Sequence, residues 1–348
     1  MSMERILYAG PRFCAVSEDG RLVEYIPAGS ENAAGKIVYG KVDRMMPGLG
    51  AAFVDIGRKK EGFLPLKENS ESFTDPPFRS GDRILVQIRR EETGNKGAML
   101  SRDLTIPGSY LLLMPKNRHL GISARLRDPD TRARLLQTAR RLSEDRFGLV
   151  MRGASAEAGE EKLREELEQL LCRWRSIQAG EGISENPEEE LLRDYGPRGI
   201  VRTEKVTELP ADLLRQLKEA GHRQIRLPHG GNIVIDRCEA MTVIDINSAS
   251  DSGDGNRRES VLRTNLEACR ETAVQIRLRN LSGILILDLI DMDLEEDRIL
   301  VQQALEEALR SDRIKTVVHG YTHLGLMEMT RKRSRDALKH FFTEEDEA

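Results

Sequence analysis

Two aspartates have the residue type and position to do chemistry. Asp245 follows an apolar, β-branched run in "MTVIDINSAS" (241–250), and Asp288 follows another in "GILILDLIDM" (283–292). A carboxylate directly after buried residues is costly unless a partner compensates its charge. Two carboxylates at neighbouring strand ends also repel each other, and a bound divalent cation relieves that repulsion. The pattern indicates a candidate metal site.

The ion that suits such a pair is a hard one. Magnesium, or manganese in its place, prefers oxygen ligands and needs only one or two carboxylates. An ion held in this way can activate a water and neutralise a phosphate. Asn247 and Asp291 lie close behind the two aspartates and are candidates to orient them. The alternative is that both aspartates simply cap the loops that follow.

The segments around the pair alternate strand and helix. Strands are expected near 232–236, 242–246, 284–290 and 316–321, with helices at 256–281 and 294–310. The first helix would cross from the Asp245 strand to the Asp288 strand, in an α/β layer whose sites lie at strand ends. The second should face inward with Ile299, Leu300, Ala304, Leu305 and Ala308.

Residues 36–103 are typical of a small closed barrel. Glycines and a proline interrupt an alternating apolar pattern, and about five short strands fit within this length. If Phe53 and Phe63 face outward, their rings can stack on unpaired bases, with Lys96 of "GNKGA" holding a phosphate. Otherwise both rings belong to the core.

The next stretch, 104–178, mixes strands and helices. Strands are expected at 104–115 and 147–153, a basic amphipathic helix at 128–143, and a second helix capped by Ser155. Arg152 could bind a phosphate with two hydrogen bonds, or could be a surface residue. The basic helix is either a solvated face or one that faces RNA. Residues 179–197 read as a polar linker or a reduced segment.

Composition limits the remaining possibilities. The chain has 348 residues, a hydrophobic content of 39% and a formal net charge of −4. That balance gives no broad basic surface, so any nucleic-acid groove must be local. We find no membrane-spanning stretch and no signal peptide. The scattered cysteines, without paired C-x-x-C spacing, favour thiols in a reducing cytoplasm over disulfides or zinc.

Taken together, the motifs resemble the RNase E/G ribonuclease family. The segments occur in that family's order: "GKVDRMMPGLGAAFVDIGRKKEGFLP", "GNKGA", "PGSYLLLMP", "GLVMR", "RLPHGGNIVIDRCEAMTVIDINS", "TNLEA", "ILDLIDM" and "LGLMEMTRKR". The resemblance covers nearly the whole chain and is strongest over 225–333. It implies an α/β multidomain fold, with RNase H-like and DNase I-like layers, an inserted OB-fold S1-like barrel and a 5′-sensor region.

The implied domains follow the chain in order. They are a first part of the RNase H-like layer (1–35), the S1-like barrel (36–103), the 5′-sensor region (104–178), a linker with the reduced RNase H-like part (179–221), the DNase I-like catalytic domain (222–340) and an acidic tail (341–348).

The resemblance also assigns roles to single residues. Asp245 and Asp288 match the magnesium ligands, and Asn247 the asparagine that positions them. The RNA-gripping residues of the barrel match Phe53, Phe63 and Lys96. The 5′-monophosphate sensor matches Gly108, Leu112, Arg152, Gly153 and Lys315.

Three departures from the family pattern stand out. The sensor has Gly153 where the family has threonine, and Lys315 where it has arginine. The connecting region before "RQIRLP" is short. No cysteine lies beyond Cys269, so we expect no structural zinc and no zinc-linked tetramer, but a monomer or homodimer.

The implied function is a Mg²⁺-dependent, single-strand-specific endoribonuclease of RNA processing or decay, with Mn²⁺ as a possible substitute. One alternative is a non-catalytic RNA-binding protein derived from the family, which would have no use for the aspartate–asparagine set. Another is a metal-dependent phosphatase acting on small molecules, which would have no use for the barrel.

Overall fold

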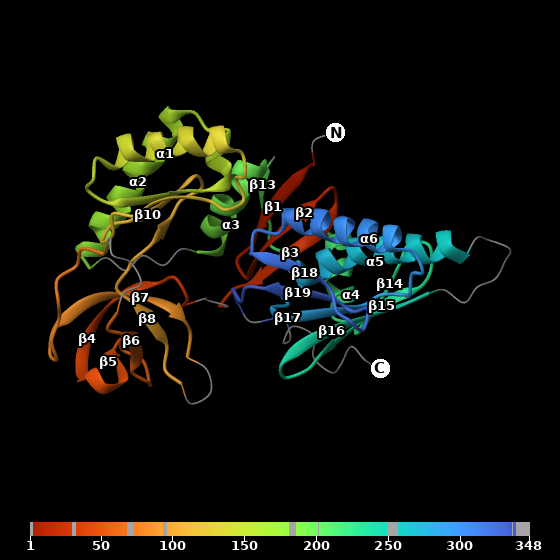
Figure 1. Ribbon diagram of the computed structural model, residues 1–348, viewed down its shortest axis with the longest axis horizontal. Helices are drawn as coiled ribbons and strands as arrows, with labels where there is room; N and C mark the ends of the chain where they lie inside the picture. Colours follow the sequence, from red (N-terminus) through yellow and green to blue (C-terminus); the bar gives the residue numbers. More distant parts are fainter. Residues whose placement is uncertain are drawn as a thin grey trace. The chain divides into compact units, whose positions relative to one another are not determined.

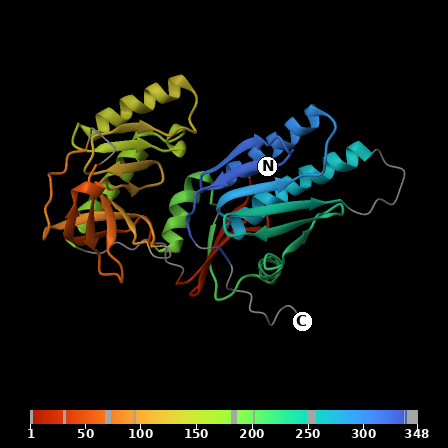
Figure 2. The same cartoon turned by 60° about the horizontal axis from the view of Figure 1, so that its bottom comes forward.

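The computed structural model describes residues 3–29, 33–67, 73–92, 96–180, 186–200, 202–248, 257–335 and 337–338. The acidic tail 341–348 lies outside these residues. The chain forms two compact units, drawn in Figures 1 and 2. The terminal unit combines Met1–Glu31 with Gly199–Ala348, and the central unit is Asn32–Arg198.

The terminal unit is built on a six-stranded sheet of order β14-β15-β16-β17-β19-β18. Its strands are β14 (Gln224–Arg226), β15 (Asn232–Arg237), β16 (Met241–Asn247), β17 (Gly283–Asp288), β18 (Thr316–Tyr321) and β19 (Met327–Arg331). Helix α5 (Arg257–Leu278) joins the parallel strands β16 and β17, as the sequence predicted. With α6 (Glu295–Ala308) it covers one face of the sheet (Figures 1 and 2).

The inward face of α6 differs from the prediction. Ile299 and Leu300 are 48% and 49% exposed, whereas Val301 and Leu305 are fully buried. One helical turn before Val301, the inward-facing position is occupied by Asp297, which is paired with Arg258 of α5 at 2.8 Å. A charged residue on the inner face hides its helical period, so the two neighbouring apolar residues were wrongly predicted to face inward.

A second sheet of order β13-β1-β2-β3 packs on the other side of α5. It consists of β1 (Arg5–Ala9), β2 (Phe13–Glu18), β3 (Arg21–Pro27) and β13 (Arg202–Lys205), together with helix α4 (Ala211–Glu219). Because α5 contacts both sheets, the second half of this helix is buried around most of its circumference. Glu18 joins the layers by accepting hydrogen bonds from Arg5 and Arg277.

The central unit contains a closed five-stranded barrel of order β4-β5-β6-β8-β7, which confirms the predicted barrel. Its strands are β4 (Ile37–Met46), β5 (Ala51–Asp55), β6 (Gly62–Pro65), β7 (Arg83–Arg90) and β8 (Met99–Ser101), with the short helix η1 (Pro47–Leu49). Val42, Val54, Leu64, Val86 and Leu100 are among the residues that fill its interior.

The rest of the central unit is a four-stranded sheet of order β11-β12-β10-β9 with three helices. The elements are β9 (Ile106–Pro107), β10 (Leu111–Met114), β11 (Leu120–Ile122), β12 (Gly148–Met151), α1 (Pro129–Ser143), α2 (Glu160–Gln178) and α3 (Pro187–Tyr195), with the short helices η2 (Gly153–Ala156) and η3 (Gly196–Arg198). The predicted basic helix is confirmed as α1.

Two local predictions here were wrong. The run 104–115 is not one strand, because the turn at Gly108 folds β9 back against β10. Ser155 does not cap α2, because this helix begins after Gly159. The Ser155 hydroxyl instead donates to the Arg152 carbonyl at 2.6 Å. Within 179–197 the structure places helix α3, whose start is fixed by an Asn186–Glu189 capping box. No helix in the described ranges has the length and apolar character to cross a bilayer.

Candidate functional site

The strand register places Asp245 directly opposite Asp288 on the parallel strands β16 and β17. Neighbouring strands lie about 4.8 Å apart, and residues paired in this way point to the same face of the sheet. Asp288 is the last residue of β17, as expected, whereas β16 continues past Asp245 to Asn247. The structure therefore brings the two predicted carboxylates together.

The carboxylates lie on the face of the sheet away from α5 and α6. Alternate residues of the same strands, Ile244, Ile246, Leu285 and Leu287, belong to the core that these helices cover. Because side chains alternate along a strand, the aspartates must project from the opposite face. Asp245 is half-buried and Asp288 is exposed. Their oxygens can therefore be reached from outside the hydrophobic core.

Asn247 contacts the pair as an orienting amide would. Its Nδ2 donates to Oδ2 of Asp245 at 2.9 Å, and lies 3.5 Å from Oδ1 of Asn232 on β15. Because the amide N–H makes these contacts, the amide oxygen of Asn247 remains as a further hard ligand for a metal ion. Asp291 is exposed beyond the end of β17.

The donors suit one type of ion better than another. Among the described residues, no group of three or more His, Cys, Asp or Glu side chains is arranged to hold a metal. A structural zinc site takes four protein ligands, mostly sulfur and nitrogen, whereas this edge offers two carboxylates and an amide. Two carboxylates with an amide beside them do fit Mg²⁺ or Mn²⁺, because these ions accept few protein ligands and retain waters.

Asn265 supports the backbone just after Asp288, a role that was not predicted from the sequence. This asparagine of the "TNLEA" segment lies fully buried on α5. Its Nδ2 donates to the Ile290 carbonyl at 2.8 Å, and its Oδ1 accepts from the Ile290 N–H at 3.0 Å. Both bonds fix the chain just after Asp288. A polar residue in the middle of a buried helix was the available signal.

Two charged pairs were also missed, one on the same face of the sheet as Asp245 and one in the loop before β15. Arg223 pairs with Asp236 of β15, and this hydrogen bond and charge raise the pKa of Arg223, with the charge of Asp245 adding to the effect. His229, in the loop before β15, bonds through Nδ1 to Glu267 of α5. The aspartate face thus has a cation beside it.

The barrel presents the predicted aromatic pair on its outer surface. Phe53 of β5 and Phe63 of β6 are directly opposed across the strands and alternate with the buried residues Val54 and Leu64. Their rings meet edge to face with centroids 6.1 Å apart. The guanidinium of Arg44 lies 4.6 Å from the Phe53 ring centroid. Neither ring is part of the barrel core, so the alternative that both rings are core residues is wrong.

Lys96 lies beside β6, the strand that carries Phe63. It is exposed, and the following residue, Gly97, packs so closely on the carbonyl oxygen of Glu61 that a Cβ there would lie 1.9 Å from it. Only glycine fits at that position. The close approach brings residues 96–98 alongside β6, and Ala98 accepts a hydrogen bond from the Phe63 N–H at 2.8 Å.

Four of the five predicted sensor residues meet in the central unit. Gly108 and Leu112 belong to the β9–β10 hairpin, and Arg152 and Gly153 follow β12, which pairs with β10. Nη1 of Arg152 donates to the Gly108 carbonyl, and the Arg152 N–H donates to the Tyr110 carbonyl at 2.8 Å. The fifth, Lys315, is an exposed residue of the terminal unit, between η4 (Leu309–Ser311) and β18.

Two carboxylates that the sequence analysis missed hold this hairpin and its arginine. Glu166 of α2 accepts the backbone N–H groups of Ser109, Tyr110 and Leu111 at 2.5, 2.8 and 2.7 Å. A Cβ on Gly108 would lie 2.6 Å from that carboxylate, so a larger residue there would displace Glu166 from the turn. Asp194 of α3 pairs with Nη2 of Arg152 at 3.1 Å.

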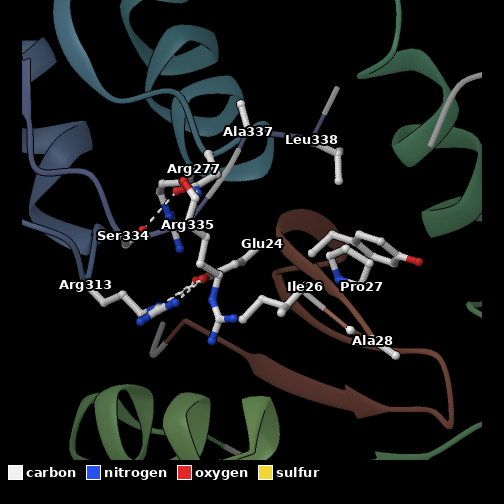
Figure 3. Close-up of a pocket in the computed structure, with 13 residues that line it drawn as sticks. Glu24, Ile26, Pro27, Ala28, Arg277, Arg313, Ser334, Arg335, Ala337 and Leu338 are labelled. Atoms are coloured by element: carbon white, nitrogen blue, oxygen red, sulfur yellow. Dashed lines mark hydrogen bonds and ion pairs between the residues drawn. The ribbon is translucent and has the colours of Figure 1, made fainter. Parts of the chain in front are cut away.

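A separate pocket of about 280 Å³ lies within the terminal unit (Figure 3). Its polar lining includes Glu24 of β3 and Arg313, which are paired at 2.6 Å, together with Arg277, Ser334 and Arg335. None of the predicted site residues lines this pocket. The candidate chemistry is therefore on the sheet face rather than in this hollow.

Comparison with known proteins identifies the class to which this fold and site belong. The model of the Ribonuclease E/G family matches residues 105–202 and 201–334. The chain belongs to this family.

Individual relatives agree. Ribonuclease G of Haemophilus influenzae is 34% identical over 89% of this chain and 74% of its own length, and Ribonuclease G of Escherichia coli K12 is 32% identical over 89% and 75%. Ribonuclease E of Haemophilus influenzae is 34% identical over 89% of this chain but only 39% of its own length. The similarity to the ribonucleases G thus extends over most of both chains.

Proposed function

We propose that this chain is a Mg²⁺-dependent endoribonuclease that hydrolyses phosphodiesters in unpaired RNA during RNA processing or decay. Its membership of the family makes it an endoribonuclease, and the proposal adds the metal, the strand preference and the residues. The observation that carries it is the pairing of Asp245 with Asp288 on adjacent parallel strands, with Asn247 bonded to the first of them. Mn²⁺ is expected to substitute for Mg²⁺.

The chain's own groups have distinct tasks in this proposal. Asp245 and Asp288 would hold the ion, which when bound supplies an activated water and neutralises developing phosphate charge. Asn247 keeps the Asp245 carboxylate in one orientation. Asn265 keeps the turn after Asp288 in place through the backbone of Ile290. Ligands fixed in this way give the ion one geometry instead of several.

The barrel supplies the preference for unpaired RNA. Phe53 and Phe63 are outer-surface rings on which unstacked bases can lie, and Lys96 provides a nearby cation for a phosphate. A duplex keeps its bases stacked and offers no free face to such rings. Single-stranded RNA is therefore the expected partner, bound by a monomer or homodimer without structural zinc.

The finer fold assignment follows the resemblance. The six-stranded sheet with α5 and α6 would be the DNase I-like catalytic layer, and the sheet of β1, β2, β3 and β13 the reduced RNase H-like layer. The closed barrel would be the S1-like domain, and β9 to β12 with α1 and α2 the 5′-sensor region. In that region Gly108, Leu112, Arg152 and Gly153 would recognise a 5′-monophosphate, and the resemblance assigns the same role to Lys315.

A cleavage assay tests the proposal. Purified protein is incubated with an internally labelled single-stranded RNA and with the matching duplex, in Mg²⁺, in Mn²⁺ and in EDTA. We expect internal cuts in the single strand with either ion and none in EDTA, with the duplex cut much more slowly. RNA binding without cleavage in any ion would identify a non-catalytic RNA-binding protein. Release of inorganic phosphate alone would identify a phosphatase.

A further inference from the structure

Helix α3 brings a largely buried carboxylate to the guanidinium of Arg152. The Asp194 side chain is 9% exposed and that of Arg152 is 33% exposed, and Nη2 of the arginine lies 3.1 Å from Oδ1 of the aspartate. The other terminal nitrogen, Nη1, donates to the Gly108 carbonyl. Two acceptors from separate elements therefore fix the plane of one guanidinium, part of which remains open to solvent.

Asp194 is shared between two arginines. Arg193, its neighbour on α3, reaches the same carboxylate from Nε to Oδ1 and from Nη2 to Oδ2, each at 3.1 Å. The three side chains together carry one net positive charge. Asp194 can thus orient Arg152 without cancelling the attraction that a phosphate would feel there.

A fixed arginine binds an anion at lower entropic cost than a mobile one. An arginine side chain has about 2 kcal/mol of rotamer entropy to lose, and a partner that has already ordered it removes part of that penalty from binding. The Gly108 carbonyl is itself held in place, because Glu166 accepts three N–H groups of the adjoining turn. Both acceptors of Arg152 are therefore anchored on helices.

We propose that Asp194 is a positioning residue that holds Arg152 ready for a 5′-terminal phosphate, and so sets how strongly this chain prefers 5′-monophosphate RNA. The inference rests on the sensor part of the proposed function. Asp194 acts through Arg152 and does not itself contact the RNA. The opposite possibility is that its carboxylate competes with the phosphate for Arg152, and the two predict opposite signs.

The test is the ratio of kcat/KM for matched 5′-monophosphate and 5′-hydroxyl oligomers. Asp194→Asn should lower this ratio about tenfold, mainly through a higher KM for the monophosphate substrate, because the charged acceptor that orders Arg152 is lost. Arg152→Ala should remove the preference, and adding Asp194→Asn to it should lower the ratio no further. Asp130→Asn, an exposed carboxylate on α1, is the matched control and should leave the ratio unchanged.

Arg193 provides a second variant that tests the charge balance. Arg193→Gln removes one of the cations that share the Asp194 carboxylate, which lowers the positive charge around Arg152, so the ratio should fall. Arg193→Lys, which keeps the charge, should restore most of it. This pair also decides the question if Asp194→Asn fails to fold, as a melting curve would reveal.

Each outcome has a definite meaning. A ratio that rises in Asp194→Asn would show competition and overturn the positioning role. A ratio unmoved by Asp194→Asn or by Arg193→Gln, but lowered by Arg152→Ala, would also overturn it while leaving the proposed sensor intact. A parent ratio near one, unmoved by Arg152→Ala, would instead remove the sensor itself, and the role of Asp194 with it.

Discussion

The aspartate face of the terminal unit and the arginine site of the central unit hold their charged groups in opposite ways. Among the described residues, Asn247 donates a side-chain hydrogen bond to Asp245, and no residue donates one to the side chain of Asp288. Arg152, by contrast, is bound by the Gly108 carbonyl and by Asp194, which is itself bound by Arg193. In the part of the chain that the structure describes, most carboxylate oxygens of the first site have no hydrogen-bond donor, whereas the guanidinium of the second is already ordered.

The difference reflects the ligand that each site is proposed to take. A metal ion replaces its waters with uncommitted carboxylate oxygens, so protein partners on those oxygens would compete with it. A terminal phosphate needs donors that already point in the right direction. Substitutions on the aspartate face should therefore abolish chemistry without loss of stability, whereas substitutions at the arginine site should change selectivity.

The largest effect is expected on the aspartate face. Asp245→Asn and Asp288→Asn should each reduce kcat by more than about a hundredfold. Even residues that only support metal ligands contribute about ten- to a hundredfold to activity. RNA affinity should stay within a few fold, because the barrel contacts remain. Single-turnover cleavage and a binding titration measure the two quantities.

Stability is the control for this prediction. Removing one of two opposed like charges should leave the melting temperature unchanged or slightly higher. Undiminished cleavage by either variant would rule out the two-carboxylate mechanism. A large fall in melting temperature would mean that the carboxylates hold the fold together instead.

A smaller loss of activity is expected when Asn265 no longer supports the backbone after Asp288. Asn265→Ala deletes both hydrogen bonds to the Ile290 backbone and should lower kcat about ten- to a hundredfold, with little change in RNA affinity. Thr264→Ala is the matched control, because among the described residues that hydroxyl donates to the Ser260 carbonyl of its own helix and to no group of the aspartate face. Equal losses in the two variants would show that α5 is merely destabilised.

The barrel offers a third test, with an effect on binding rather than on chemistry. Phe53→Ala and Phe63→Ala should each weaken single-stranded RNA binding by about 1–3 kcal/mol, the scale of one lost base stack. Since both rings lie outside the barrel core, the cost in stability should be far below the roughly 3–5 kcal/mol of a buried phenylalanine. Melting curves beside the titration would contradict this placement if they showed the larger loss.

Sequence reasoning located what depends on local pattern. The barrel strands, the β16–α5–β17 crossover and the opposed aspartates all follow from apolar periodicity and from strand-end residues, which a single sequence displays. The outward direction of Phe53 and Phe63 remained open, because phenylalanine in a strand is compatible with either face. The burial of their strand neighbours Val54 and Leu64 in the barrel interior decides it, because side chains alternate between the two faces of a strand.

Glu166 and Asp194 could not be found in this way, and the one signal for Asn265 was a polar residue within a buried helix. Asn265, Glu166 and Asp194 act on backbone or side chains from elements distant in the chain, and their own sequence neighbourhoods are ordinary helix. The segment containing Asp194 was read as a polar linker or a reduced segment because it is short, acidic and interrupted by glycine and proline. Long-range contacts of this kind leave no periodic signal.

The smallest expected effect would sharpen the contrast at the arginine site. A Cβ on Gly153 would meet nothing within 4 Å, so a side chain can be added there without displacing its neighbours. Where the family has threonine, Gly153→Thr would add one hydroxyl donor beside Arg152, and one hydrogen bond to a charged group is worth about 1.5 kcal/mol at the low end, or roughly tenfold. We therefore expect the parent preference for 5′-monophosphate over 5′-hydroxyl RNA to be present but weak, and Gly153→Thr to raise it by up to about tenfold. Gly153→Val has nearly the same shape without the hydroxyl and should leave the preference unchanged. An equal rise in both variants would assign the gain to a stiffer backbone, and no rise in either would mean that a terminal phosphate does not reach this position.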